Sequence, residues 1–504
     1  MNRKHLIQQL DSTPGWDICI IGGGATGLGT ALDAASRGFK TILFEQYDLA
    51  KGTSSRSTKL VHGGVRYLQQ GNIKLVMEAL KERGLLLKNA PHLVHNQKFV
   101  VPNYKWWEKP FYGIGLKIYD KMAGKLGLGP SQLLSKEETL SLAPTLDPKG
   151  LKGGVIYHDG QFDDARLAIS IAQTAVRQGA VVLNYFPVAG LLKMNNKICG
   201  LWVKDQFTGK EYEVKSKVVI NATGVFTDAV MKMDDAKHKN IISPSQGIHL
   251  VVDKDFLPGD TAIMIPRTDD GRVLFAVPWH SKIILGTTDT AVDNISAEPV
   301  PKEQEIAFIL KHAGRYLSKD PGTEDVKSMF AGLRPLVKGN TKKTAALSRE
   351  HLITVADSGM ITITGGKWTT YRKMAEDVID IAIEKNALPV YACKTKDLKL
   401  NGHDKPVLPA EAASLEKDEL TSLIKIAVEE ELCMTVEDFL SRRTRQLLLD
   451  AREAIRVAPL VAELMAMQMN KNEGWIKEQM NIFNEIAKNY IPVTNRDNKP
   501  KTIN

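Results

Sequence analysis

The stretch that decides the fold is Trp16-Asp17-Ile18-Cys19-Ile20-Ile21-Gly22-Gly23-Gly24-Ala25-Thr26-Gly27-Leu28-Gly29. Its apolar run, Ile18 to Ile21, predicts a buried parallel strand that leads directly into Gly22-x-Gly24-x-x-Gly27. An Ala-rich helical segment, Thr30 to Arg37, follows, and a second apolar run, Thr41 to Phe44, ends at Glu45. Strand, glycines, helix, second strand and terminal acid together form the βαβ unit that holds a dinucleotide.

Each part of this unit has a physical role. Gly22 permits the tight turn, and Gly24 lets the backbone approach a pyrophosphate. Gly27 lets the helix pack against the strand, and the N-terminus of the helix faces the phosphates. Glu45 can accept hydrogen bonds from a ribose hydroxyl. The alternative is a glycine-rich turn in an ordinary α/β core, which the complete unit disfavours.

Length and composition describe a globular chain of 504 residues, with 43% apolar and 25% charged residues and room for roughly three domains. Met1 to Asp17 is polar, and no run approaches the roughly 18 apolar residues of a spanning helix, so we expect neither a signal peptide nor a membrane span. The four cysteines (Cys19, Cys199, Cys393 and Cys433) lie far apart, which disfavours a metal site and favours a reducing compartment. We therefore expect a protein that is cytoplasmic or peripheral to a membrane.

The net charge of +9 leaves nucleic acid, anionic lipid and an anionic substrate open as partners, so its distribution matters. Lys98 to Lys125 concentrates seven aromatic residues and six lysines, with a local balance of +4. Aromatic residues beside lysines are typical of a segment at a membrane interface. The alternative is a helix and loop that bury the aromatic rings while the lysines face water.

Gly52 to Leu68 is rich in hydroxyls and glycine, with cations interspersed. Its position directly after the βαβ unit favours a loop wrapped around a polar ligand over a solvated linker. Further on, Ser243 to Met329 reads as mostly antiparallel strands, and Gly365 to Arg372 repeats the order of strand, glycines and helix start. Helical spacing then predicts a C-terminal helical domain, with helices over Ser422–Glu430, Val436–Thr444, Leu447–Val457 and Leu460–Gln468 and a last one ending near Tyr490.

These residues resemble the FAD-dependent (aerobic, quinone-linked) glycerol-3-phosphate dehydrogenases. The resemblance rests on Gly22-Gly23-Gly24-Ala25-Thr26-Gly27, Ser54 to Tyr67, Ala331-Gly332-Leu333-Arg334-Pro335-Leu336, Gly365-Gly366-Lys367-Trp368-Thr369-Thr370-Tyr371-Arg372 and Thr435 to Arg445. It implies an α/β fold, in which an FAD-binding Rossmann-like domain of the glycine-oxidase type carries an antiparallel-sheet substrate domain and a C-terminal helical domain. We assign residues 16–97, 151–242 and 340–388 to the FAD-binding domain, 98–150 and 243–339 to the substrate-binding and membrane-facing domain, and 389–504 to the helical domain.

The resemblance also implies an activity. The enzyme would oxidise sn-glycerol 3-phosphate to dihydroxyacetone phosphate by hydride transfer to FAD and pass the electrons to membrane quinone. Its partners would be the substrate, the quinone and an anionic membrane surface on the inner face of the cell membrane; it would bind no nucleic acid, and a homodimer stays open. Two other classes stay open as well: a peroxide-forming glycerol-3-phosphate oxidase, and a flavin-binding protein that acts on nucleic acid, which only the charge suggests.

Carried over residue by residue, the resemblance predicts a substrate pocket lined by Arg66, Tyr67, His249, Arg334 and Lys367, of which all but Tyr67 would be catalytic. We expect no metal. The predicted FAD-binding residues are Gly22, Gly24, Ala25, Thr26, Gly27, Glu45, Ser54, Ser55, Ser57, Thr58, Lys59, His62, Gly63, Gly64, Thr223, Gly224, Gly366, Thr369 and Thr370.

Chemistry argued from the residue types agrees with these roles. A phosphate dianion calls for guanidinium groups, which Arg66 and Arg334 could supply. Oxidation of a secondary alcohol needs a base for the hydroxyl proton, and His249 suits that role, with His62 as competitor. Lys367, at a helix start, could stabilise negative charge on the flavin or on the substrate oxygen.

Overall fold

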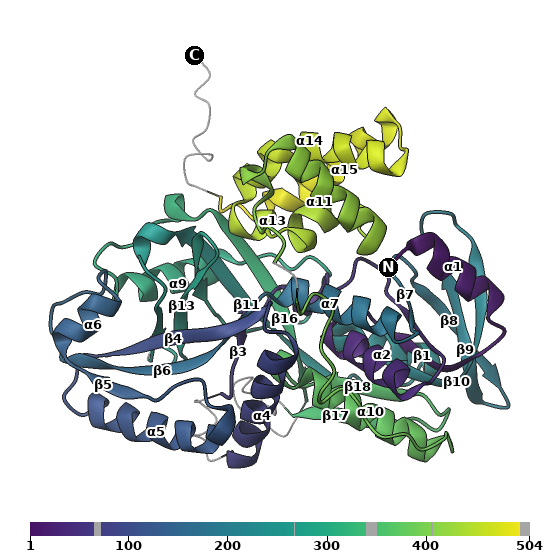
Figure 1. Cartoon of the computed structure of the whole chain (residues 1–504), viewed down its shortest axis with the longest axis horizontal. Coiled ribbons are helices and arrows are strands. Elements are labelled where there is room, and N and C mark those ends of the chain that lie inside the picture. Colours follow the sequence, from purple (N-terminus) through teal and green to yellow (C-terminus); the bar gives the residue numbers. More distant parts are fainter. Residues whose placement is uncertain (65–71, 267, 339–349, 405–406, 494–504) are drawn as a thin grey trace.

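A computed structural model describes residues 1–64, 72–266, 268–338, 350–404 and 407–493. Two β-sheets lie side by side, each with helices packed against it, and the C-terminal helices sit above their junction (Figure 1). The predicted α/β fold with an antiparallel-sheet domain and a helical appendage is confirmed. Among the described residues, no helix is long and apolar enough to cross a membrane.

The first sheet is built on the βαβ unit predicted from the sequence. Its strands run in the order β17-β18-β10-β1-β2-β7, and β8 and β9 extend it as a hairpin from β10. The bounds are β1 (Trp16–Ile21), β2 (Thr41–Phe44), β7 (Val181–Leu183), β8 (Val188–Met194), β9 (Lys197–Lys204), β10 (Glu211–Asn221), β17 (His351–Val355) and β18 (Ile361–Gly365). The pairs β1–β2, β1–β10, β2–β7 and β10–β18 are parallel, as strands covered by helices usually are. The covering helices are α2 (Ala25–Arg37), α7 (Asp164–Arg177) and α10 (Tyr371–Lys385).

The second sheet has the order β15-β11-β14-β13-β12-β4-β6-β3, with β16 beside β11 and β5 beside β6. Only its β4–β12 pair is parallel among the described pairs. The bounds are β3 (Leu60–Val61), β4 (Val94–Asn103), β5 (Gln132–Leu134), β6 (Gly153–Phe162), β11 (Ile242–Asp253), β12 (Ala262–Ile265), β13 (Leu274–Trp279), β14 (Lys282–Gly286), β15 (Thr290–Ala291) and β16 (Ser328–Val337). Because β6 pairs with β3 and β4, residues 60–61, 94–97 and 153–162 lie in this sheet rather than in the FAD-binding part to which we assigned them; the remaining domain boundaries stay a proposal.

Helices α4 (Ile73–Asn89) and α5 (Glu108–Ala123) pack together and lie below the second sheet in Figure 1. Tyr112, Leu116 and Tyr119 of α5 are buried, as is Phe99 on β4. Trp106, Phe111, Ile114 and Ile118 are exposed. The aromatic residues of Lys98 to Lys125 therefore divide between the core and the surface, so neither of the two interpretations of this segment holds for the whole of it.

The C-terminal region is helical as predicted, but the helix boundaries differ: the predicted helix Leu447–Val457 is divided at Asp450, and the predicted break at Pro459 is absent. Its elements are α11 (Lys417–Glu430), α12 (Val436–Asp438), a π-helical turn (Phe439–Arg443), α13 (Gln446–Leu449), α14 (Ala451–Met469) and α15 (Glu473–Lys488). We expected separate helices on either side of Pro459, but α14 runs through it. Ala458, Val461 and Ala462 beside the proline are all fully buried, and their packing offsets the roughly 3 kcal/mol that an internal proline costs a helix.

A buried ionic cluster joins this helical region to the first sheet. Asp48, in the segment after β2, accepts hydrogen bonds from Arg442 Nε at 2.5 Å and from Arg443 Nη1 at 2.7 Å. The two guanidinium groups hold the pKa of Asp48 below its usual value despite its burial. The helical region is therefore anchored to the segment between β2 and the hydroxyl-rich loop that begins at Gly52.

Candidate active site

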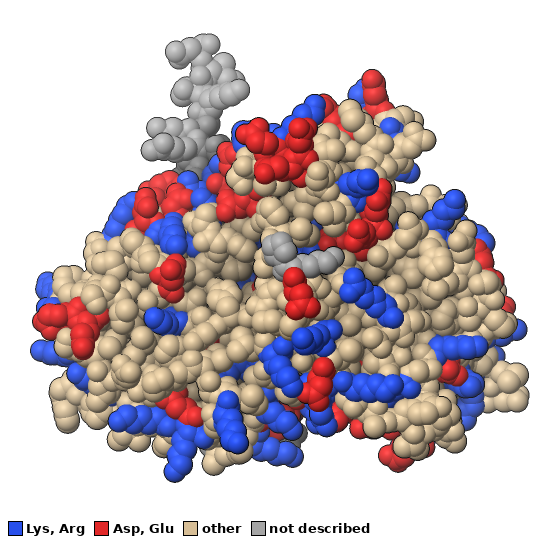
Figure 2. Space-filling model, viewed as in Figure 1, with Lys and Arg blue, Asp and Glu red and all other residues tan. Residues whose placement is uncertain are grey.

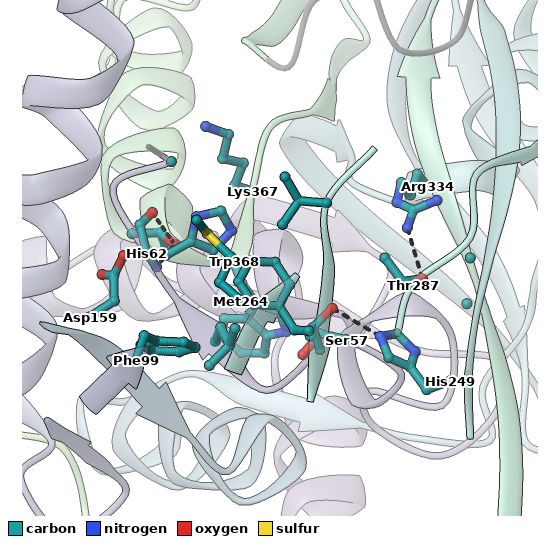
Figure 3. Close-up of a pocket in the computed structure, with 18 of the residues that line it drawn as sticks. Ser57, His62, Phe99, Asp159, His249, Met264, Thr287, Arg334, Lys367 and Trp368 are labelled. Carbon is teal, nitrogen blue, oxygen red and sulfur yellow. Dashed lines mark hydrogen bonds between the residues drawn. The ribbon is translucent and has the colours of Figure 1, made fainter. Parts of the chain in front are cut away.

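Two cavities adjoin between the sheets. One, of about 280 Å³, lies at the glycine turn after β1, and the other, of about 670 Å³, lies against the second sheet. Both are lined by Thr53, Pro335, Gly365, Gly366, Lys367 and Trp368, so they are two halves of one cleft. In the close-up of the larger half, His62 and Lys367 lie on one side, and His249 and Arg334 lie on the other (Figure 3).

The smaller half has the shape that a dinucleotide needs. Gly22 has a φ of 109°, and a Cβ on Gly27 would lie 1.9 Å from the carbonyl oxygen of Gly22, so both positions require glycine. Gly24 precedes the first residue of α2, and the N–H of Ala25 donates to Ser54 Oγ at 2.9 Å. A glycine cradle at a helix N-terminus fits a pyrophosphate. The residues present therefore fit the expected FAD.

Glu45 lies in the wall of the smaller half and also holds the glycine turn. Its carboxylate accepts from the N–H of Gly23 at 2.6 Å and from the N–H of Tyr47 at 2.9 Å. Burial raises the pKa of Glu45, and these two hydrogen bonds oppose that rise. The sequence suggested only a ribose contact for this acid, which stays a prediction.

The hydroxyl-rich loop after β2 contributes to both halves, which excludes the solvated-linker alternative for its described part. Trp368 Nε1 donates to the carbonyl oxygen of Ser54 at 2.8 Å, and the N–H of His62 donates to Thr369 Oγ1 at 3.2 Å. The predicted cofactor residues that line the cleft are Gly22, Gly24, Ala25, Thr26, Glu45, Ser54, Ser57, Thr58, His62, Gly64, Thr223, Gly224, Gly366 and Thr369.

Five other predicted cofactor residues lie behind the cleft wall: Gly27, Ser55, Lys59, Gly63 and Thr370. Lys59 is the clearest correction, because its ammonium group is completely buried and donates to Asp164 Oδ1 at 2.7 Å and to the carbonyl oxygen of Ser55 at 2.6 Å. Its side chain therefore points into the core and not toward a cofactor. No local pattern indicates this pairing, since Asp164 is more than a hundred residues away in the chain.

The larger half is built on one face of the second sheet. In the pairing of β11 with β16, His249 lies opposite Phe330, Gly247 opposite Gly332 and Ser245 opposite Arg334. Because alternate residues of a strand share a face, these six project to the same side of the sheet. A Cβ on Gly247 would lie 2.2 Å from Arg334 Nη2, and a Cβ on Gly286 would lie 2.2 Å from His249 Cδ2. The two glycines therefore make room for the two predicted catalytic side chains.

His249 is only 2% exposed and is held from two sides. Its Nε2 shares a hydrogen bond with Thr58 Oγ1 at 2.9 Å, and its ring stacks on Phe330 with centroids 4.9 Å apart. Burial, followed by the charges of Arg334 and Lys59, holds the pKa of His249 well below its usual value. The imidazole is therefore neutral and in the form that accepts a proton.

Arg334 and Lys367 complete the described part of the predicted substrate pocket. Arg334 Nη2 donates to the carbonyl oxygen of Thr288 at 2.9 Å and to Thr287 Oγ1 at 3.2 Å, which holds the guanidinium in place. Lys367 precedes the 3₁₀ turn that starts α10 and lines both halves of the cleft. The predictions for Arg66 and Tyr67 lie outside the described residues.

The site also contains residues that the sequence reasoning missed. Gly247, Gly286, Thr287 and Phe330 all take part in the contacts around His249 and Arg334. One of them had a signal in the sequence: Gly247 lies two residues before His249, where the predicted strand begins, and residues two apart on a strand share a face. Gly286 of β14, Thr287 directly after it and Phe330 of β16 could be found only through strand pairing.

Comparison with known proteins gives consistent matches. Residues 17–372 match the family described as FAD dependent oxidoreductase, and residues 361–476 match the C-terminal domain of alpha-glycerophosphate oxidase. The mitochondrial glycerol-3-phosphate dehydrogenase of Macaca fascicularis is 40% identical, over 97% of this chain and 75% of its own length. Its counterpart from Schizosaccharomyces pombe is 36% identical, over 97% and 89%.

Solved structures agree with these matches. The glycerol-3-phosphate dehydrogenase from Bacillus halodurans, crystallised with FAD, superposes with a TM-score of 0.80 at 30% identity and covers 97% of this chain and 98% of its own. Glycine oxidase from Bacillus cereus shares the fold alone, with a TM-score of 0.53 at 18% identity over 75% of this chain and 96% of its own.

Proposed function

The chain belongs to the FAD-dependent glycerol-3-phosphate dehydrogenases, and from this membership we propose that it oxidises sn-glycerol 3-phosphate to dihydroxyacetone phosphate and passes the electrons to membrane quinone. The observation that carries the substrate assignment is the placement of His249 and Arg334 on one face of the second sheet, in the larger cavity that adjoins the one at the glycine turn. His249, the candidate base, and Arg334, the candidate phosphate-binding residue, thus lie in one cavity that adjoins the dinucleotide site.

The described residues supply what the substrate needs. Arg334 binds the phosphate, because hydrogen bonds to Thr287 and Thr288 already orient its guanidinium. Asp289 Oδ1 lies 3.5 Å from Arg334 Nη1 and shares that guanidinium with the phosphate. His249 accepts the proton of the C2 hydroxyl as general base, and Thr58 fixes the plane of its ring. Lys367 stabilises negative charge that develops on the substrate oxygen. FAD, when bound, accepts the hydride.

The apolar side of the larger cavity supports quinone as the electron acceptor. Leu60, Phe99, Tyr112, Tyr157, Met264 and Phe275 line this side. Phe111 of α5, which is 51% exposed, lines the cavity as well, so the apolar wall reaches the molecular surface. A quinone ring is flat and apolar and suits such a wall, whereas dioxygen would need no apolar surface of this size.

The outer surface of α5 supports docking on an anionic membrane. Phe111, Ile114 and Ile118 are 51%, 63% and 48% exposed, and their spacing places them along one side of the helix. Lys117 and Lys121 are exposed beside them. Figure 2 shows blue side chains gathered along the lower edge of the molecule, where α4 and α5 lie in Figure 1. An apolar strip flanked by lysines is suited to anionic headgroups.

The decisive experiment for this function is a comparison of acceptors. Purified holoenzyme is given glycerol 3-phosphate and either a quinone analogue or dissolved oxygen alone. We expect dihydroxyacetone phosphate to form at the expense of the quinone, with little peroxide. Fast turnover on oxygen with matching peroxide would make the enzyme an oxidase, and absence of flavin reduction by glycerol 3-phosphate would refute the substrate.

A further inference from the structure

A buried hydrogen-bond chain lies directly behind the larger cavity. Tyr119 of α5 donates from its hydroxyl to Asp159 Oδ2 at 2.8 Å, and Arg83 Nη1 of α4 donates to Asp159 Oδ1 at 2.8 Å. All three side chains are at least 95% buried. Asp159, on β6, also lines the cavity, so the chain connects the two helices below the sheet to the cleft wall.

The Tyr119 hydroxyl, at one end of this hydrogen-bond chain, also binds the backbone of the hydroxyl-rich loop. The hydroxyl oxygen of Tyr119 accepts from the N–H of Gly63 at 2.8 Å. A Cβ on Gly63 would lie 2.5 Å from that oxygen and 2.5 Å from Leu80 Cδ2, so only glycine allows this approach. On the other side, the N–H of His62 donates to Thr369 Oγ1 at 3.2 Å. The turn at residues 62–64, where His62 and Gly64 line the cavity, is therefore clamped between α5 and the start of α10.

The direction of the hydrogen bonds is settled by charge. Burial, followed by the nearby Asp159, raises the pKa of Tyr119 well above its usual value, so the phenol stays protonated. Its single proton goes to the carboxylate, and its oxygen is left to accept from Gly63. Arg83 forms an ion pair with the Asp159 carboxylate and so holds that carboxylate next to the Tyr119 hydroxyl. Removal of the Tyr119 hydroxyl would leave the buried N–H of Gly63 without this acceptor.

We propose that Tyr119 is a positioning residue of the reaction, which holds the turn at residues 62–64 in the cleft wall from α5 through the Tyr119–Asp159–Arg83 chain. The proposal rests on the proposed function in one respect, that FAD occupies the cleft. Tyr119 and Arg83 do not line the cavity: they act by fixing the backbone from which His62 and Gly64 face it.

The test is Tyr119→Phe in the holoenzyme, which removes one oxygen and keeps the ring. Flavin reduction by glycerol 3-phosphate is followed by anaerobic stopped flow without membranes. We expect the rate constant to fall roughly tenfold, since small errors of position in a reaction site are costly, while the dissociation constant of the substrate changes by less than about twofold. The visible spectrum of the bound flavin should shift as well, which mere loss of stability would not produce.

Tyr104→Phe is the matched control. Tyr104 also donates one hydrogen bond from its hydroxyl, to the carbonyl oxygen of Asp147 at 2.9 Å, and lies outside the cavity wall. It should lower thermal stability by a similar amount and leave the reduction rate and the spectrum unchanged. If Tyr119→Phe matches this control in both readouts, the inference is wrong.

Two further arms separate the remaining outcomes. If the wild type is not reduced by glycerol 3-phosphate, the proposed substrate fails, and the flavin spectrum of Tyr119→Phe still tests the positioning role without any substrate. If Tyr119→Phe does not fold, Arg83→Lys is tested in its place. Arg83→Lys keeps the phenol and the buried positive charge but weakens the hydrogen bond to Asp159. A rate and a spectrum like those of the wild type in that variant would also overturn the inference.

Discussion

Replacement of Gly247 by alanine should weaken substrate binding through Arg334, although Gly247 itself carries no side chain. The added Cβ would lie 2.2 Å from Arg334 Nη2 and 2.6 Å from its Cζ, whereas ordinary contacts begin at 3.4 Å. The guanidinium would therefore have to move by at least about 1 Å, away from its hydrogen bonds to Thr287 and Thr288.

The magnitude follows from two limits. Overpacking of a filled site destabilises a fold by about 1–3 kcal/mol. The same cost, borne by the bound state in which Arg334 must return to the phosphate, would raise the dissociation constant roughly 5- to 150-fold. Complete loss of a charged contact, as in Arg334→Ala, costs about 2–5 kcal/mol, or roughly 30- to 4000-fold. Gly247→Ala should therefore raise the dissociation constant of glycerol 3-phosphate less than Arg334→Ala does, and by more than about fivefold.

The assay is stopped-flow flavin reduction over a range of glycerol 3-phosphate concentrations, which separates the dissociation constant from the reduction rate. Gly190→Ala on β8 is the matched control, because its Cβ would meet Trp202 at an ordinary 3.9 Å and Gly190 lines neither half of the cleft. Trace activity on glycerol, which lacks the phosphate, should change little. Wild-type affinity in Gly247→Ala, or an equal loss on glycerol, would refute the assignment of Arg334 to the phosphate.

Three other outcomes are expected. His249→Asn should slow flavin reduction by about 10²–10⁴-fold, and an unchanged rate would mean that another group is the general base. Because the pKa of His249 is held well below 6.5, kcat/KM of the wild type should stay level as pH falls from 8 to about 6.5 and drop only below the lowered pKa. Ile114→Ser/Ile118→Ser should weaken co-sedimentation with anionic liposomes roughly tenfold or more, because apolar burial in the membrane is lost. Val390→Ser, which alters an 87% exposed side chain on another part of the surface, should leave binding unchanged. Equal binding by the two variants would argue against α5 as the docking surface. Acid or heat should release free FAD from the purified yellow protein, and flavin that stays with the precipitate would show a covalent link.

Local patterns predicted the elements that carry the dinucleotide site. The order of apolar run, glycines and helix requires only neighbours in sequence, and β1 and β2 appear where it placed them, while α2 begins earlier than predicted, at Ala25 rather than Thr30. Predictions failed where distant packing opposed a local preference. Pro459 reads as a helix break, but burial on both sides of it keeps α14 continuous. The short helix α1 (Arg3–Ser12) was not predicted because only Leu6 and Leu10 form its buried side.

The sequence alone therefore predicted the fold class and the dinucleotide site, because spacing within one element fixes which face a residue takes. His249 and Arg334 were proposed from the resemblance to the glycerol-3-phosphate dehydrogenases, and their roles stay predictions. Tertiary structure decided which candidates reach the cleft. Lys59 turns inward because Asp164 offers a buried partner, and Gly63 lies against Tyr119 because α5 packs behind the loop. Buried polar groups need hydrogen-bond partners, and here those partners belong to segments distant in the sequence. Spacing within one segment cannot reveal them.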